Sequence, residues 1–240
     1  MTKPFTEWTV LPHSPLRRVD DNMLTVTGNL HMPVGDFPRR MTVARLRNGK
    51  LVIYSAIALD ETEMQTLETF GQPAYLIVPN AIHRMDAKIW KDRYPAIRVI
   101  APPGVRAAVE QIVPVDATTI QFGDPDVSYV VVPGTASREA ALLVHGASGT
   151  TLVINDLIWN VDHRPGFRGW VLKMMRFTGR APKIPPMVKR KLVDDRDALQ
   201  DQFEKWSRIG DLQRIIVSHG EIVTETPGRA LHRMAGTLAA

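Results

Sequence analysis

Ile216-Val-Ser-His219-Gly220 is the stretch that decides the fold, because an apolar run there stops abruptly on a histidine and a glycine. Two other apolar runs stop on polar side chains in the same manner, in Val78-Pro-Asn-Ala-Ile-His83 and in Val153-Ile-Asn-Asp156. Sheets of α/β proteins present functional groups at the ends of their buried strands. The three segments therefore predict one site that is assembled from distant parts of the chain.

The composition favours a globular protein with a sizeable core. The chain has 240 residues, 44% of them hydrophobic, and we expect a single domain. No apolar stretch approaches the roughly 18 residues of a membrane span, and the first residues lack the apolar core of a signal peptide. These features predict a cytoplasmic protein. The chain has no cysteine, so any metal site must use histidine, aspartate or glutamate.

Positive charge is concentrated in residues 163–193. The net charge of the chain is +5, and this stretch contains no acidic residue. It is predicted to be a basic, proline-rich insertion, and its interleaved aromatic and basic side chains favour an amphipathic helix with a basic face. A solvated face, a lid over the site and a membrane-surface contact through residues 164–191 all fit this pattern. No recognition motif accompanies the charge, so we expect no binding to nucleic acid.

The first half of the chain has clear local signals. Residues 1–40 are rich in proline and predict an irregular arm with one or two edge strands. Apolar runs at 41–46 and 51–54 flank Asn48-Gly49, which is a strong hairpin signal. Asp60 is the expected N-cap of a helix that ends at Phe70.

The rest of the chain predicts a mixed architecture. Strands and helices alternate from residue 75 to residue 113, as is typical of α/β proteins. Closely spaced strands at 119–122, 127–132, 140–144 and 151–154 predict an antiparallel meander. A helix at about 194–208, a strand at 215–218 and a helix at about 227–238 are expected to follow.

Taken together, Val132-Pro-Gly-Thr135, Leu152-Val-Ile-Asn-Asp156 and Ile216-Val-Ser-His219-Gly220 resemble the second half of metallo-β-lactamase-like proteins. In that superfamily a Pro-Gly-His turn, a strand pair ending in Gly-Asp and a late strand ending in His-Gly carry metal ligands. The opening hairpin and the strand at 94–100 resemble a poorly characterised branch known mainly as a domain of unknown function. The resemblance covers roughly residues 20 to 235 and implies an α/β fold, a four-layer αββα sandwich formed by residues 1–240.

The first motif of the superfamily, His-x-His-x-Asp-His, is expected after the strand at 75–78. When its last histidine is matched to His83, Val78 and Asn80 stand where the first two histidines would be, and Ile82 stands where the aspartate would be. This half of the resemblance therefore implies one retained ligand and three lost ones.

The later motifs are better preserved. Thr135 stands at the histidine of the Pro-Gly-His turn, whereas the bridging aspartate and the late histidine are retained as Asp156 and His219. The resemblance implies that His83, Asp156 and His219 form the remaining ligand set. Three ligands cannot hold two ions, but two histidines and a carboxylate are a known set for one catalytic zinc or non-haem iron ion.

The resemblance thus implies a hydrolase with a reduced site, which holds one zinc, iron or manganese ion or no ion at all. An ion there would activate a water, and Asn80 or Thr135 would donate a hydrogen bond to it. Arginine and lysine side chains of residues 164–191 would favour a small anionic substrate. The alternative is a non-catalytic binding or scaffold protein that uses residues 164–191 for contact with a membrane surface or a partner. Glycine-rich nucleotide loops and a Gly-x-Ser-x-Gly elbow are absent, and the sequence gives Ser55 no catalytic role.

Overall fold

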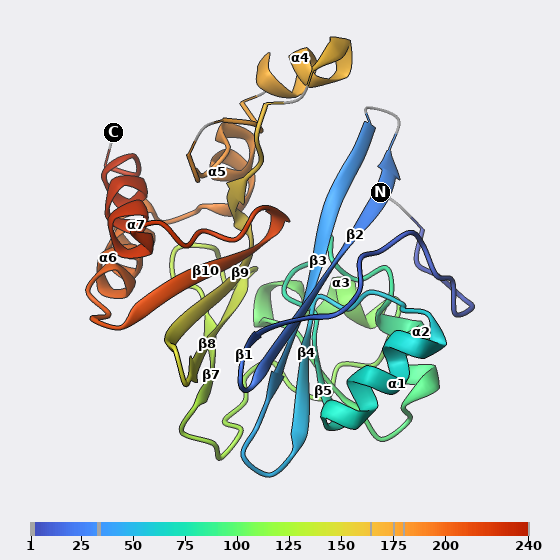
Figure 1. Cartoon of the computed structure of the whole chain (residues 1–240). Helices are drawn as coiled ribbons and strands as arrows, with labels where there is room; N and C mark the ends of the chain where they lie inside the picture. Colours follow the sequence, from blue (N-terminus) through green and yellow to red (C-terminus); the bar gives the residue numbers. More distant parts are fainter. Residues whose placement is uncertain (1–2, 33–34, 164, 175, 180, 240) are drawn as a thin grey trace.

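The structure is a computed structural model, and it describes residues 3–32, 35–163, 165–174, 176–179 and 181–239. Two sheets face each other in it (Figure 1). One has six strands in the order β1-β2-β3-β4-β5-β6, and the other has four in the order β10-β9-β8-β7. The strands of the first sheet are β1 (Arg17–Asp20), β2 (Met23–Met32), β3 (Gly35–Arg45), β4 (Lys50–Tyr54), β5 (Gln72–Ile77) and β6 (Arg98–Ile100). Those of the second are β7 (Val127–Val131), β8 (Ala140–Gly146), β9 (Gly149–Asn160) and β10 (Leu212–Gly220).

Helices cover the outer face of the first sheet. They are α1 (Glu61–Phe70), α2 (Ala87–Arg93), a short 3-10 turn (Pro103–Val105) and α3 (Arg106–Glu110). Met64, Leu67 and Trp90 from these helices are fully buried against strand residues in one apolar cluster. Burial of such side chains is the main source of stability for this half of the molecule.

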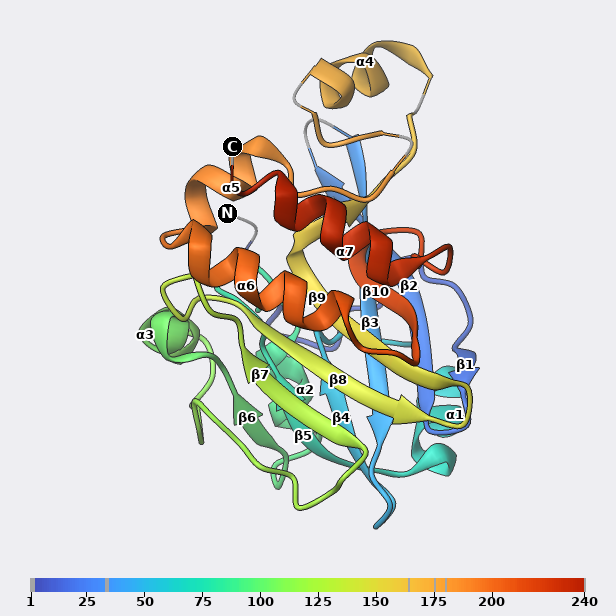
Figure 2. The ribbon, with the colours of Figure 1, turned by 90° about the vertical axis from the view of Figure 1, so that its left-hand side faces the viewer.

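Two further helices cover the outer face of the other sheet. They are α6 (Arg196–Ser207) and α7 (Pro227–Gly236), which lie side by side over β7–β10 (Figure 2). Phe203 and Trp206 of α6 and Leu231 of α7 pack into one cluster with the strands. Asp195 caps α6 by accepting a hydrogen bond from the Ala198 amide, as an N-cap aspartate should.

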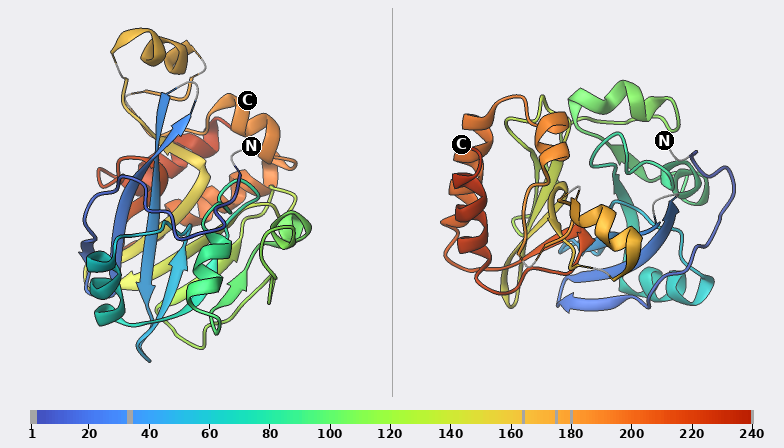
Figure 3. Two further views of the ribbon diagram at one scale, coloured as in Figure 1. Left: turned by 90° about the vertical axis from the view of Figure 1, so that its right-hand side faces the viewer. Right: turned by 90° about the horizontal axis from the view of Figure 1, so that it is seen from above.

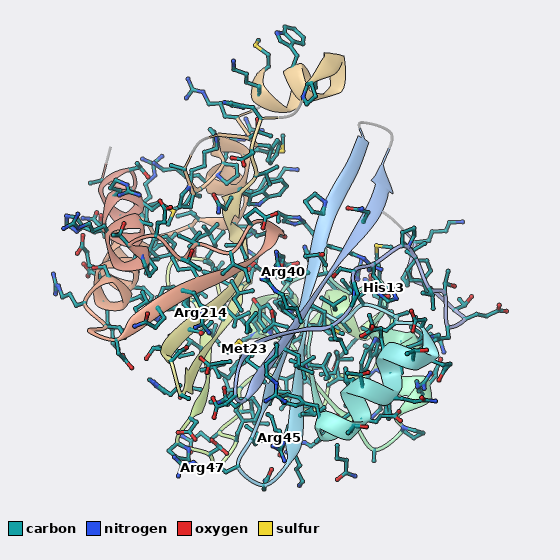
Figure 4. All side chains as sticks on the ribbon, in the orientation of Figure 1. His13, Met23, Arg40, Arg45, Arg47 and Arg214 are labelled. Atoms are coloured by element: carbon teal, nitrogen blue, oxygen red, sulfur yellow. The ribbon has the colours of Figure 1, made fainter. Side chains whose placement is uncertain are left out.

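The inner faces of the two sheets form a third core. Val52 and Ile77 of the first sheet pack with Leu142 and Val153 of the second. Arg40 also lies between the sheets (Figure 4) and donates hydrogen bonds to the carbonyl groups of β10. Viewed from above, the order is helices, sheet, sheet, helices (Figure 3). The predicted four-layer αββα sandwich is confirmed.

The sequence predicted element boundaries correctly where a turn or an N-cap residue sets them. The β3–β4 hairpin turns at Asn48-Gly49, with Gly49 at φ 80°, and Asp60 caps α1 by accepting a hydrogen bond from the Glu63 amide. The predicted meander is present as β7, β8 and β9.

Two predictions about strands need correction. Residues 119–122 form no strand, although Phe122 is buried between the sheets. Residues 1–40 are more regular than an arm, because β1, β2 and the first part of β3 lie there and pair along a long hairpin. Apolar pattern locates buried side chains, but it does not show whether a neighbouring backbone is free to pair.

The basic segment contains two short helices with different positions. α4 (Gly166–Met174) stands away from the body of the molecule (Figures 1 and 2), whereas α5 (Pro186–Leu192) lies against β9. Arg164, Met175 and Arg180 of the segment lie outside the described residues. Among the helices that the structure describes, none has the length and apolar character to cross a membrane.

Candidate metal centre

The three residues predicted as metal ligands come together at one edge of the sandwich. Nε2 of His83 lies 3.2 Å from Oδ1 of Asp156 and 3.2 Å from Nε2 of His219. Nε2 of His219 lies 2.8 Å from the same Asp156 oxygen. The side chains of His83, Asp156 and His219 are 9%, 6% and 11% exposed. Three potential ligand atoms therefore converge, although they come from the loop after β5, from β9 and from β10.

An irregularity in β9 positions Asp156. The parallel pairing of β9 with β10 is interrupted between Ile154 and Trp159, where residues 155–158 stand opposite Ser218 alone. Extra residues in one strand bend it locally and redirect its side chains. Asp156 therefore lies within a strand and not, as the sequence suggested, directly after one.

Gly220 allows β10 to end against β9. Its φ is 104°, in the left-handed region that favours glycine. A Cβ atom at this position would lie 1.9 Å from the Asn160 carbonyl oxygen. A glycine at the end of the strand is therefore required by the close approach of the two backbones, and this approach positions the preceding residue, His219.

The surroundings of His219 define which ring nitrogen is available. Nδ1 of His219 lies 2.7 Å from the carbonyl oxygen of Pro38. Because a carbonyl oxygen only accepts hydrogen bonds, Nδ1 must carry the proton. In the neutral ring Nε2 then presents its lone pair, as in metal-binding histidines held by a backbone carbonyl. The Trp159 ring packs against the imidazole, with 4.2 Å between ring centroids.

Ser55 orients His83. The Ser55 hydroxyl lies 2.9 Å from Nδ1 of His83, which leaves Nε2 toward Asp156 and His219. Ser55 follows β4 directly and has a φ of 58°, which is uncommon for a residue other than glycine. Such backbone strain concentrates at functional sites.

Asn80 links the loop after β5 to Asp156. Its amide nitrogen donates to Oδ2 of Asp156 at 2.8 Å and to Oε2 of Glu139 at 2.9 Å. Its amide oxygen accepts hydrogen bonds from the Ile82 and His83 backbone amides. One side chain therefore holds the loop that carries His83 and also occupies the second oxygen of Asp156, so that Oδ1 alone faces the histidines.

The two buried carboxyl groups have opposite pKa shifts. For Glu139, burial raises the pKa well above its ordinary value, and the nearby Asp156 charge raises it further. For Asp156, burial acts in the same direction, but His83 and His219 outweigh it and hold the pKa below its ordinary value. The negative charge of this pair thus resides on Asp156, beside the two histidines.

The donor set fits one metal ion. A tetrahedral site with zinc–ligand bonds of about 2.0–2.1 Å has ligand atoms about 3.3 Å apart. The observed separations of 2.8 and 3.2 Å are shorter by only a few tenths of an ångström. His83, Asp156 and His219 form a candidate metal-binding group, and small side-chain movements suffice to hold an ion.

Thr135 and a nearby buried carboxylate, Asp86, have surroundings that differ from those of the three candidate ligands. Thr135 is fully buried, and its hydroxyl donates to the Val132 carbonyl; it does not line the pocket beside the ligands. The catalytic roles predicted for Asn80 and Thr135 stay predictions. Asp86 pairs with Arg39 and accepts a hydrogen bond from a backbone amide, and burial raises its pKa even though Arg39 opposes this.

A pocket of about 610 Å³ opens over the site. His83, Asp156 and His219 form part of its lining, together with Asn80 and Ser55. Most of the remaining lining is apolar. A concave, mainly apolar pocket with a few convergent polar groups is the usual form of a small-molecule site.

Comparison with solved structures identifies the fold. The structure is similar to the FIM-1 metallo-β-lactamase of Pseudomonas aeruginosa in its mono-zinc form, with a TM-score of 0.63, 13% identity and coverage of 95% of this chain and 96% of that one. It is also similar to the DIM-1 metallo-β-lactamase, at TM-score 0.63, 13% identity and coverage of 97% and 100%. No protein-family model and no curated protein matches the sequence. The chain has the metallo-β-lactamase fold.

Proposed function

We propose that this protein is a metal-dependent hydrolase with a single ion held by His83, Asp156 and His219. The observation that carries the proposal is the approach of two Nε2 atoms and one carboxylate oxygen to within 3.2 Å of one another in the pocket lining. Two histidines and one carboxylate leave an open coordination position for water or substrate. One of the similar enzymes was solved in a mono-zinc form, which supports a one-ion site on this fold.

The residues around the ligands also support a one-ion site. A second ion would need further ligands where the chain has Asn80, Ile82 and Thr135. The Asp156 oxygen that does not face the histidines already accepts a hydrogen bond from Asn80. An uncharged amide, an isoleucine and a buried threonine do not offer the charge that a second divalent cation requires.

The protein groups have separate tasks in this proposal. A zinc, iron or manganese ion would supply Lewis acidity and lower the pKa of a bound water. The Pro38 carbonyl and Ser55 hold the two histidines by their Nδ1 atoms. Asn80 fixes Asp156, and the apolar walls of the pocket lower the local dielectric, which strengthens the electrostatic interactions of the site.

Hydrolysis assays test this proposal directly. Chelator-treated protein is assayed against chromogenic esters, lactones, thioesters and phosphodiesters, before and after addition of one equivalent of Zn²⁺, Fe²⁺ or Mn²⁺. We expect hydrolysis of one substrate class to require the ion and to fall at least about 100-fold in His83→Ala and His219→Ala. His232→Ala is the matched control, because this side chain is 72% exposed. Hydrolysis that persists in the chelated protein would refute the proposal.

A second candidate is a metal-free serine hydrolase. Its support is the chain of contacts from the Ser55 hydroxyl through both nitrogens of His83 to Asp156, at 2.9 and 3.2 Å. A serine beside a histidine that contacts a carboxylate can act as a nucleophile. A fluorophosphonate probe, which reacts with activated serines, distinguishes the two candidates. If the protein is a serine hydrolase, the probe should label the parent but not Ser55→Ala, and treatment with a chelator should not change the labelling.

Several expectations stay proposals. A cytoplasmic location and the absence of nucleic-acid binding rest on the composition alone. The non-catalytic alternative, in which residues 164–191 contact a membrane or partner, rests on the same composition. The convergence of His83, Asp156 and His219 favours the hydrolase, because a scaffold has no need for three ligand atoms in a pocket.

A further inference from the structure

The walls of the pocket come from opposite halves of the sandwich. Ile82 and Val105 contribute from the side of the first sheet. Met187, Val188 and Leu192 contribute from α5, which packs on β9 of the second sheet. The ligand residues line the same pocket as these two apolar walls, so a molecule bound at the ligands also contacts apolar side chains.

Core packing does not explain two of the apolar side chains of the walls, Ile82 and Met187. Ile82 is 63% exposed and Met187 is 37% exposed, and both line the pocket. Large exposed apolar side chains that gather around one cavity indicate a binding surface. Trp159 and Phe177 extend the same surface beside the site, with 4.7 Å between their ring centroids.

The charged residues of the lining divide into two groups. Arg39 pairs with Asp86, and Asp156 contacts the two histidines. Arg138 and Lys191 also line the pocket. Among the residues that the structure describes, neither of these two side chains forms an ion pair with a carboxylate.

Arg138 and Lys191 lie close together at one end of α5. Arg138 donates hydrogen bonds to the carbonyl oxygens of Thr135 and Leu192, the residue next to Lys191. A pair of cations beside an apolar cavity complements a ligand that has one anionic group and an apolar body.

We infer that the pocket receives a small amphipathic anion, whose apolar body lies between Ile82 and α5 and whose anionic group lies at Arg138 and Lys191. This names the substrate class of the proposed hydrolase and in that sense rests on the proposed function, but binding itself requires only the pocket. Acyl compounds of medium chain length with a carboxylate have this chemistry.

Calorimetric titration of chelator-treated protein with hexanoate, octanoate and decanoate tests the inference. Each buried methylene should tighten binding about fourfold, so octanoate should bind about 15-fold more tightly than hexanoate. Octylammonium, which has the same chain and the opposite charge, should bind at least about tenfold more weakly than octanoate. The absence of binding, or an affinity that does not change with chain length, would overturn the inference.

Variants locate the bound molecule. Met187→Glu should weaken octanoate binding at least about tenfold, because it places an anion on the apolar wall. Met174→Glu is its matched control, since Met174 is 65% exposed and lies on α4, outside the pocket lining. Arg138→Gln and Lys191→Gln should each weaken octanoate binding about two- to fivefold, whereas Lys173→Gln on α4 should not. Equal losses in variants and controls would overturn the inference.

The experiments distinguish a failure of the pocket assignment from a failure of the proposed function. Octanoate binding should persist in the chelator-treated protein, because the pocket walls remain when the ion is removed. Octanoate binding by a protein that takes up no metal ion when Zn²⁺, Fe²⁺ or Mn²⁺ is added would refute the metal-dependent hydrolase and support the pocket assignment. Uptake of one metal ion without any octanoate binding would overturn the pocket assignment alone.

Discussion

Asn80 is the residue through which the parts of the site are connected. Its side chain makes hydrogen bonds to Asp156 and Glu139 and to the backbone amides of Ile82 and His83. It is 2% exposed, so water cannot easily replace these bonds. Buried polar groups that lose their partners cost more free energy than the bonds contribute when made.

Replacement of Asn80 by alanine should therefore affect both stability and metal affinity. We expect Asn80→Ala to lower the free energy of unfolding by about 2 kcal/mol, because buried carboxyl oxygens and two amides lose their partner. We also expect metal affinity to fall about 10- to 100-fold, because Asp156 is no longer oriented. Urea denaturation and metal titration measure the two effects. Asn48→Ala, in the exposed β3–β4 turn, is the control, and equal behaviour of the two variants would contradict this role.

Some of the site residues could be predicted from the sequence and others could not. His83, Asp156 and His219 follow or end apolar runs, and the resemblance to the superfamily singled them out. Ser55 and Glu139 were not found, because they carry no motif and gain their roles only from contacts with residues far away in the chain. The contact between Asn80 and Glu139, for example, joins residues 59 positions apart.

At the scale of elements, the ends of β9 and β10 determine the site. Gly220 has a positive φ and lies against the Asn160 carbonyl. Gly49 also has a positive φ, of 80°, but has no atom within 4 Å of the place where a Cβ would be. A substitution at Gly49 therefore tests the effect of backbone conformation alone, whereas a substitution at Gly220 tests backbone conformation and close backbone approach together.

Alanine at these two positions should have unequal consequences. Gly49→Ala should cost about 1–2 kcal/mol, the penalty of the left-handed conformation. Gly220→Ala should cost several kcal/mol, because β9 and β10 must also separate, and it should lower metal affinity by displacing His219. Thermal unfolding with metal titration measures both. Similar stability losses, with metal affinity retained in Gly220→Ala, would show that the strand end does not position the histidine.

Element boundaries followed the sequence where side-chain caps and turns set them, as at Asp60 and Gly49. The boundaries differed from the sequence prediction where pairing with the backbone of a neighbouring element determines them. β9 continues through Asp156 to Asn160, since polar residues inside it find partners in Glu139, Asn80 and Ser218. Residues 119–122 have an apolar pattern, but among the described residues only Ala117 makes an isolated bridge to β6 in this region.

At the scale of the whole molecule, Asp20 joins the two sheets. It is the last residue of β1. Its carboxylate accepts hydrogen bonds from the Ser148 hydroxyl and amide in the β8–β9 turn and pairs with Arg214 of β10 at 3.0 Å. Arg214 extends from β10 toward β1 (Figure 4). Burial would raise the pKa of Asp20, but the bonds from Ser148, Asp21 and Arg214 together lower it to about 2.

This pKa predicts a pH-dependent contribution to stability. A carboxyl whose pKa is lower in the folded than in the unfolded state stabilises the fold above its unfolded pKa, near 4, and this stabilisation is lost as the pH falls toward 2. Asp20→Asn should therefore lower the free energy of unfolding by about 2 kcal/mol at pH 7, and by much less near pH 2.5. Urea denaturation at both values tests this, with exposed Asp201→Asn as the control. If the loss of stability in Asp20→Asn is the same at both pH values, the ion pair is not its cause.

The central claim is that the sandwich holds one metal ion through His83, Asp156 and His219. Metal analysis by mass spectrometry of untagged protein, purified without chelator and then titrated with Zn²⁺, tests it most directly. We predict one equivalent of ion in the parent and in His232→Ala, and loss of the ion in His83→Ala, Asp156→Ala and His219→Ala that remain folded. Two equivalents in the parent, no ion at all, or an ion retained in these three variants would contradict the claim.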